Sequence, residues 1–189
     1  MSLPNSIKKF LDFLKEDTWQ SWIVSLILIL IFIKLIFFPT LSFITGTPLP
    51  LVVVESCSMY HESSFDNWWE NNKDFYSSKN ISKSDFTYFP LHSGLNKGDI
   101  VIVWGHSSYK QGDIIIFNAN TQYPIIHRLI STLPFSTKGD HNQGQLSSEK
   151  NIPADALLGK AVAKIPLIGW IKLIFFEFAK PENQRGLCK

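Results

Sequence analysis

The feature that most constrains this chain is an unbroken apolar run that is long enough to cross a lipid bilayer. It covers residues 22–38 (WIVSLILILIFIKLIFF), about 17 residues that would form a helix roughly 26 Å long. Its single charged residue, Lys34, lies near one end, where a long side chain can reach the lipid headgroups. The run therefore predicts a transmembrane helix at residues 22–38.

A cleaved signal peptide is the main alternative for this run. The run is longer than the apolar core of a usual signal peptide, and the following residues 39–43 (PTLSF) lack the small-x-small pattern of a cleavage site. We therefore expect an uncleaved signal anchor that stays in the membrane.

Positive charge near the run predicts its orientation. Lysines lie at positions 8, 9 and 15, whereas no Lys or Arg occurs between Lys34 and Lys73, and basic residues tend to stay on the cytoplasmic side. Residues 1–21 are thus expected in the cytoplasm, with an interfacial helix that begins at Asn5 or Ser6. The chain is predicted to be a single-pass protein of the cell membrane, with the rest outside the cell or in a lumen.

The residues beyond the run are enough for one domain with its own core, which we place at 39–164. A net charge of +2, without a basic cluster, argues against a nucleic-acid partner. Two cysteines, Cys57 and Cys188, cannot make a disulfide framework, and neither belongs to a C-x-x-C zinc pattern. We therefore expect no metal and no cofactor.

Short apolar runs after the anchor predict β-strands. Residues 49–54, 99–104, 113–117 and 123–131 are rich in β-branched and other apolar side chains, and Gly-containing loops separate several of them. A succession of strands without alternating helices is typical of antiparallel sheets. The expected fold class is mostly β, with an antiparallel β domain behind an N-terminal transmembrane helix.

Two further segments leave alternatives open. Residues 62–90 show no sustained period, and their many aromatic side chains could fill a core or form a platform at the membrane interface. Residues 165–189 form a separate C-terminal segment, whose apolar stretch 165–178 is short and carries charges. An amphipathic helix on the membrane surface suits it better than a short second span, which stays the alternative.

Ser58 is the candidate nucleophile, because it lies in the segment 55–60 (ESCSMY) just beyond the anchor. A serine needs a general base within hydrogen-bond reach. Of the five histidines, His127 lies within an apolar strand, where burial without a partner would be costly, although a satisfied core histidine is the alternative. Asp140 lies in a polar turn (TKGDHN) that could fold back alongside this strand or could simply close a turn.

Five short motifs occur in one order along the chain. They are 56–59 (SCSM), 98–101 (GDIV), 112–115 (GDII), 127–128 (HR) and 138–140 (KGD). Behind a signal anchor, this order resembles the type I signal peptidases, specifically the archaeal and endoplasmic-reticulum branch, in which histidine occupies the position where the bacterial enzymes use lysine. The resemblance covers most of residues 22–170.

The resemblance implies a role for each matching residue. Ser58 would be the nucleophile, His127 the general base and Asp140 the acidic partner. Ser56 would help to hold the oxyanion, together with the main-chain amide of Ser58. Met59 would help to line the substrate cleft.

One departure from the family bears on the acidic partner. Many relatives carry a second aspartate shortly after the first, whereas this chain has glutamine and glycine there and only Glu149 beyond. Asp140 is therefore preferred as the partner of His127, and Glu149 stays the alternative.

The activity implied by the resemblance is that of a membrane-bound serine endopeptidase of the Ser-His-Asp type. It would cleave N-terminal signal peptides from secreted preproteins and read small residues at the first and third positions before the cut. The expected partners are those signal peptides and the lipid bilayer, with the protein secretion channel as an open further partner. The alternative is a catalytically silent, membrane-anchored β domain that binds secreted or membrane partners, with Ser58 and His127 merely structural.

Overall fold

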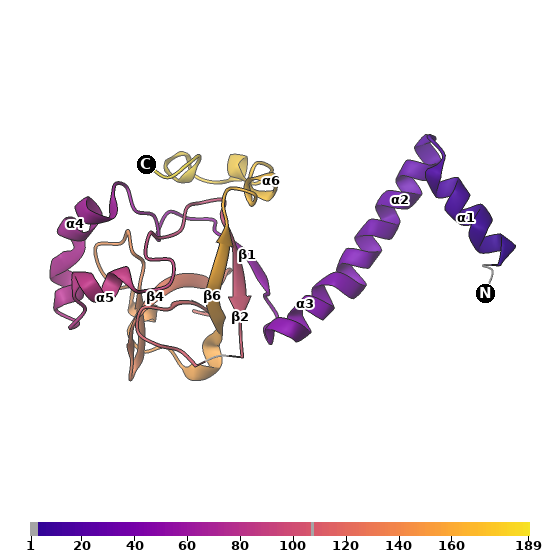
Figure 1. Ribbon diagram of the computed structural model, residues 1–189. Helices are drawn as coiled ribbons and strands as arrows, with labels where there is room; N and C mark the ends of the chain where they lie inside the picture. The colour runs from indigo at the N-terminus through magenta and orange to yellow at the C-terminus, as the bar shows by residue number, and fades with distance from the viewer. Residues whose placement is uncertain (1–3, 107) are drawn as a thin grey trace. The chain divides into compact units, whose positions relative to one another are not determined.

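The computed structural model describes residues 4–106 and 108–189, and Figure 1 labels their helices and strands. The chain divides into two compact units, of which the first ends at Ile44 and the second covers Thr45–Lys189. The first unit holds most of the apolar helix, and the second holds the sheet and every candidate site residue.

Helices make up the described part of the first unit. Helix α1 (Asn5–Lys15) is amphipathic and leaves its apolar side chains exposed. A continuous apolar helix then covers Trp19–Thr45, with a stretch of mean hydropathy 2.7, and it is the one helix among the described residues that is long and apolar enough to cross a membrane. Its parts are α2 (Trp19–Phe32), the π-helical turn η1 (Ile33–Phe37) and α3 (Phe38–Thr45).

The apolar helix continues past residue 38, where the sequence placed the end of the span, and passes through Pro39 to Thr45. A proline has no N–H to donate to the preceding turn, and its ring crowds that turn. The wider π-helical turn at Ile33–Phe37 lies just before Pro39 and gives the kind of local adjustment by which membrane helices accommodate a proline.

The second unit is built on a six-stranded sheet in the order β1-β2-β6-β3-β4-β5. The neighbouring strands of the described chain pair antiparallel, which confirms the expected sheet direction. Strands β1 and β5 form the two edges of the sheet. The strands are β1 (Leu51–Val53), β2 (Ile100–Trp104), β3 (Ile114–Phe117), β4 (Ile125–Thr132), β5 (Phe135–Lys138) and β6 (Leu157–Ile165).

Strand β3 is buried on both of its faces. Ile114 and Ile116 pack into one apolar cluster, and Ile115 and Phe117 pack into another, since alternate side chains of a strand point to opposite faces. This double burial explains why the strand has consecutive apolar residues rather than an alternating pattern.

Residues 62–90, which the sequence left unassigned, contain two helices that lie beside β4 (Figure 1). Ser64 caps α4 (Phe65–Ser77), and Ser82 begins α5 (Lys83–Thr87) with a capping box. Of the two alternatives for the aromatic residues, burial in a core holds for most of the large ones, while Tyr88 is exposed. The buried aromatic residues, which pack with Ile130 of β4, are Trp68, Trp69, Tyr76 and Phe86.

The expected mostly β class is met only in part. The second unit has an antiparallel sheet at its centre, but more of the described chain is helical than extended. The apolar N-terminal helix and the two helices of residues 62–90, which we call the insert, account for the difference.

The C-terminal segment forms short helical turns, so the alternative of a second span is wrong for the described residues, and the membrane-surface role stays a prediction. Strand β6 continues to Ile165, and only short helical turns follow, so the described residues contain no second membrane-spanning helix. The indole of Trp170 donates to the Lys97 carbonyl (3.0 Å), and the buried Lys97 ammonium pairs with Glu177 (2.7 Å). These contacts hold the C-terminal segment against the rest of the second unit. Its short helices are α6 (Trp170–Leu173), η4 (Glu177–Ala179) and η5 (Glu182–Gln184).

Candidate active site

Ser58 lies in a tight loop shortly after the edge strand β1. The carbonyl of Ser58 accepts a hydrogen bond from the His141 N–H (2.8 Å), and the carbonyl of Met59 accepts one from the Leu95 N–H (2.8 Å). The Met59 side chain is buried in an apolar cluster that includes side chains of β2 and β3. These bonds fix the main chain at Ser58 and at the residue that follows it.

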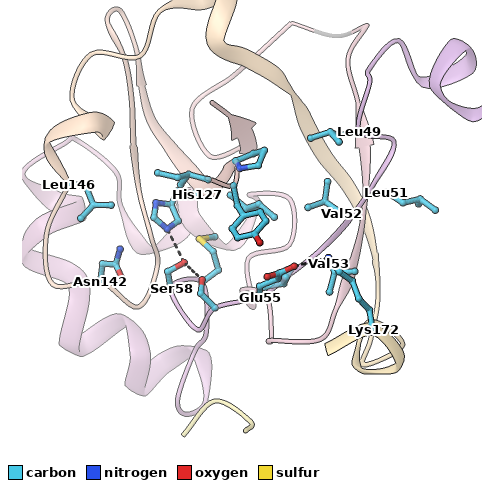
Figure 2. A pocket seen from close by; sticks show the side chains of 17 residues that line it. Leu49, Leu51, Val52, Val53, Glu55, Ser58, His127, Asn142, Leu146 and Lys172 are labelled. Carbon is cyan, nitrogen blue, oxygen red and sulfur yellow. Dashed lines mark hydrogen bonds and ion pairs between the residues drawn. The ribbon is translucent and has the colours of Figure 1, made fainter. Parts of the chain in front are cut away.

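His127 is held by strand β4, and its ring points at Ser58 (Figure 2). The Nε2 atom of His127 lies 2.9 Å from the Ser58 Oγ atom. The histidine is 5% exposed and is opposite Ile115 in the β3–β4 ladder. Two residues that are 69 positions apart in the sequence thus form the hydrogen-bonded pair that the sequence reasoning expected.

The carboxylate that contacts His127 belongs to Glu149, in the 3₁₀ turn η2 (Ser147–Glu149). Its Oε1 atom is hydrogen-bonded to Nδ1 of His127 and accepts a second bond from the Thr137 hydroxyl (3.1 Å). Its Oε2 atom accepts the Leu146 N–H (2.6 Å). Glu149 is fully buried, and these bonds compensate for the water that the carboxylate has lost.

This contact decides the tautomer of His127. A carboxylate can only accept hydrogen bonds, so the ring proton lies on Nδ1 and is donated to Glu149. Nε2 is then left to accept the Ser58 hydroxyl proton. Ser58, His127 and Glu149 therefore form a hydrogen-bonded series in which a hydroxyl faces a neutral imidazole, and a carboxylate orients that imidazole.

The preference for Asp140 as the partner of His127 is wrong. Asp140 is fully buried and binds Arg128, with 2.6 Å between Nη2 and Oδ2 and 2.9 Å between Nε and Oδ1. His127 and Arg128 are successive residues of one strand, so their side chains point to opposite faces of the sheet. The KGD turn does fold back beside β4, as expected, but its carboxylate lies on the Arg128 face.

Further bonds surround the Asp140 carboxylate. The Tyr76 hydroxyl donates to Oδ1 (3.1 Å), and Nε2 of His61 lies 3.1 Å from Oδ2. Burial alone would raise the pKa of Asp140, but the Arg128 guanidinium and the bonds from His61 and Arg128 hold that pKa well below its ordinary value. Asp140 is thus the buried anionic partner of Arg128.

Ser56 lies beside Ser58, with 3.1 Å between the two hydroxyl oxygens. The N–H of Ser58 has no hydrogen-bond acceptor within residues 4–106 and 108–189. A hydroxyl and a main-chain amide close to the serine are the kind of donors that can hold an oxyanion.

Gly139 allows the KGD turn to approach the site closely. A methyl group at this position would lie 2.7 Å from the Ser58 carbonyl oxygen, 2.8 Å from Nε2 of His127 and 2.6 Å from Nδ2 of Asn142. A larger side chain at this position would have to displace the atoms of the Ser58–His127 pair. This explains on steric grounds why the KGD motif has glycine here.

Lys138, the lysine of the same motif, is fully buried but contacts the insert rather than Ser58. Its Nζ atom donates to the Gly139 carbonyl (3.1 Å) and lies 5.1 Å from the ring centroids of Phe75 and Tyr76. Burial lowers the pKa of Lys138 to about 8. The base next to Ser58 is therefore the imidazole and not a lysine.

The pair Ser58–His127 opens into a cleft of about 650 Å³ (Figure 2). One wall comes from the edge strand β1 and the residues that flank it, and another from the start of β4 with Tyr123 and Pro124 before it. Most of the lining is apolar, including Met59, as expected from the sequence. The charged lining residues are Glu55 and Lys172, which form an ion pair (2.8 Å).

A disulfide bond fastens the loop that carries Ser58, and the sequence reasoning missed it. Cys57, next to Ser58, is bonded to Cys188, 131 positions further along the chain. Lys172 also pairs with the Glu55 carboxylate, and Lys180 donates to the Glu55 carbonyl (3.1 Å). Two cysteines so far apart carry no spacing signal, which is why only the folded chain reveals their pairing.

Within residues 4–106 and 108–189, no group of three or more His, Cys, Asp or Glu side chains is arranged to hold a metal ion. No protein-family model matches the chain, and a search of the curated proteins found no significant match. The geometry of the site is therefore the main basis for a functional conclusion.

Proposed function

We propose that the chain is a membrane-anchored serine endopeptidase that removes N-terminal signal peptides from secreted preproteins. The observation that carries the proposal is the hydrogen-bonded series Ser58–His127–Glu149 at an apolar cleft. A nucleophile, a base and an orienting carboxylate in this order are the groups that serine-dependent acyl transfer requires. A chain that also carries a membrane-length apolar helix is suited to substrates that emerge from a membrane.

In the proposed reaction, Ser58 Oγ attacks the carbonyl carbon of the scissile peptide bond while Nε2 of His127 takes the hydroxyl proton. We assign the Ser58 N–H and the Ser56 hydroxyl as donors to the oxyanion that develops. The C–N bond then breaks, and the imidazolium returns its proton to the leaving nitrogen. A water molecule, deprotonated by His127 in turn, hydrolyses the acyl-enzyme and regenerates Ser58.

The edge of the sheet supports binding of an extended peptide. Strand β1 pairs with β2 on one side only, and Val52 and Val53 of this strand line the cleft. An exposed edge can accept a further strand through main-chain hydrogen bonds, with side-chain pockets giving selectivity. We assign this edge to the signal-peptide side of the substrate, and small residues at the first and third positions before the cut remain part of the proposal.

The disulfide supports the proposed topology, in which the second unit lies outside the cytoplasm. Disulfides form and persist in oxidising compartments and are rare in the cytosol. Cys57 and Cys188 both belong to the second unit, whereas the lysines that predict a cytoplasmic side precede the apolar helix.

The deciding test is cleavage of a preprotein by the purified full chain in detergent, next to a Ser58→Ala variant. The wild type is expected to release the signal peptide at one bond, identified by mass spectrometry, and Ser58→Ala is expected to lose this activity because the attacking atom is gone. Thermal melts should be similar for the two proteins, since little volume changes. Cleavage that survives Ser58→Ala, or a wild type that binds preproteins without cutting them, would favour the silent binding domain instead.

A further inference from the structure

Asn142 borders the nucleophile on the side away from strand β1. It follows the KGD turn, and its N–H donates to the Gly139 carbonyl (2.9 Å), which closes this turn. In Figure 2 its side chain and that of Leu146 lie on one side of Ser58, while Glu55 and Val53 lie on the other.

The Asn142 amide has hydrogen-bonding capacity that the fold does not use. It lines the cleft and is half-buried, yet it makes no hydrogen bond with the residues that the structure describes. An asparagine amide offers two N–H donors and one carbonyl acceptor. A methyl group added at Gly139 would lie within 3 Å of both Nδ2 of Asn142 and Nε2 of His127. The two nitrogens are therefore close together, and a group held by this amide would be near the imidazole.

The cleft is unequal on its two sides of Ser58. The side formed by β1 and the start of β4, the long side, contributes most of the lining residues, and most of these are apolar. The Asn142 side contributes Asn142 and Leu146, and Leu146 is 49% exposed. A signal peptide is apolar before the cut, and the chain after the cut need not be. The long side therefore suits the signal peptide, and the Asn142 side suits the residues that follow the scissile bond.

We propose that Asn142 is a substrate-binding residue that binds the main chain of the first residues after the cut, with Leu146 against their side chains. This inference rests on the proposed function and deepens it. Nδ2 donates to a main-chain carbonyl of the leaving segment, and Oδ1 accepts a main-chain N–H. Held in this way, the leaving nitrogen lies close to His127, which supplies its proton when the C–N bond breaks.

The test compares two substrates that are identical up to the scissile carbonyl. One peptide continues for three residues after the bond, and the other ends there as a methyl ester. For both substrates kcat/KM reports the steps up to acylation, so the ratio of variant to wild type isolates the contact with the leaving segment. The enzyme is the full chain in detergent.

Asn142→Ala is expected to lower kcat/KM for the continued peptide about tenfold, which is the effect of losing one or two hydrogen bonds. The same variant should change kcat/KM for the methyl ester less than about twofold. Asn142→Leu, which is close in size but offers neither a donor nor an acceptor, should show the same selective loss. Gln143→Ala is the matched control, since Gln143 is its exposed neighbour outside the cleft lining.

Three outcomes would overturn the assignment. An equal loss on both substrates would mean that Asn142 only shapes the turn, and no loss on either would mean that it contacts nothing of the substrate. In both cases the proposed function would stand. If the wild type cuts neither substrate, the proposed function fails and the assignment fails with it.

Discussion

The two buried carboxylates near Ser58 differ because each faces a different side of strand β4. Glu149 faces the imidazole of His127, and Asp140 faces the guanidinium of Arg128. Sequence reasoning could place both acids near this strand, but it could not give the side on which each carboxylate lies. Neighbouring residues of a strand face opposite sides of the sheet, so a motif match that placed Asp140 near the strand could not show that its carboxylate faces Arg128 instead of His127.

Substitution of the two acids is expected to separate their roles. Glu149→Gln should lower the single-turnover cleavage rate by roughly a thousandfold or more, because an amide can hold the wrong tautomer of His127 and carries no charge. Asp140→Asn should instead destabilise the fold by about 3–5 kcal/mol, because it leaves the buried Arg128 without its partner.

Single-turnover cleavage and urea unfolding of both variants decide between these roles. Folded Asp140→Asn protein should retain most of its rate at low temperature. A stable Asp140→Asn protein with little activity, together with an active Glu149→Gln protein, would restore Asp140 as the partner of the base.

At the scale of elements, β1 to β4 could be predicted from the sequence, whereas β5, β6 and the insert helices were not predicted. Residues 99–104, 113–117 and 123–131 are apolar runs, and they contain β2, β3 and most of β4. In α4 the buried Trp68 and Trp69 are adjacent, and the surrounding residues are mostly polar, so no helical period stands out. The caps at Ser64 and Ser82 were the available signals.

The insert is joined to the sheet through a histidine whose charge depends on pH. His61 stacks on Trp68 of α4 (3.8 Å between ring centroids) and contacts Asp140. Burial lowers the pKa of His61 below its ordinary value of 6.5, with Asp140 opposing this shift and Arg128 and Lys164 adding to it. The unfolded chain therefore binds this proton more readily, so the stability given by neutral His61 is complete above pH 6.5 and decreases as the pH falls below it.

The thermal midpoint of the wild type is accordingly expected to fall on acidification below about pH 6.5. In His61→Gln, which keeps an amide donor for Asp140 but cannot titrate, the midpoint should depend less on pH over the same interval. His92→Gln is the control, because His92 is exposed. Equal pH dependence in the wild type and His61→Gln would contradict the assignment.

At the scale of the whole molecule, the bond between Cys57 and Cys188 closes a loop across most of the second unit. Cross-links over long loops stabilise mainly by restricting the unfolded chain. The double variant Cys57→Ser/Cys188→Ser is expected to lose about 2–5 kcal/mol of unfolding free energy, measured by urea titration without a reductant. A reductant should lower the wild type to the level of the double variant, and unchanged unfolding of that variant would show that the bond does not stabilise the fold.

The same cross-link can form only late in the synthesis of the chain. A chain leaves the ribosome from its amino end, so in the proposed topology Cys57 crosses the membrane long before Cys188, which follows 131 residues later. Until Cys188 arrives, the residue next to Ser58 carries a free thiol and its loop has no covalent tether. In the proposed topology the bond can form only after residue 188 has crossed the membrane, so the loop that carries Ser58 gains its covalent tether late in export.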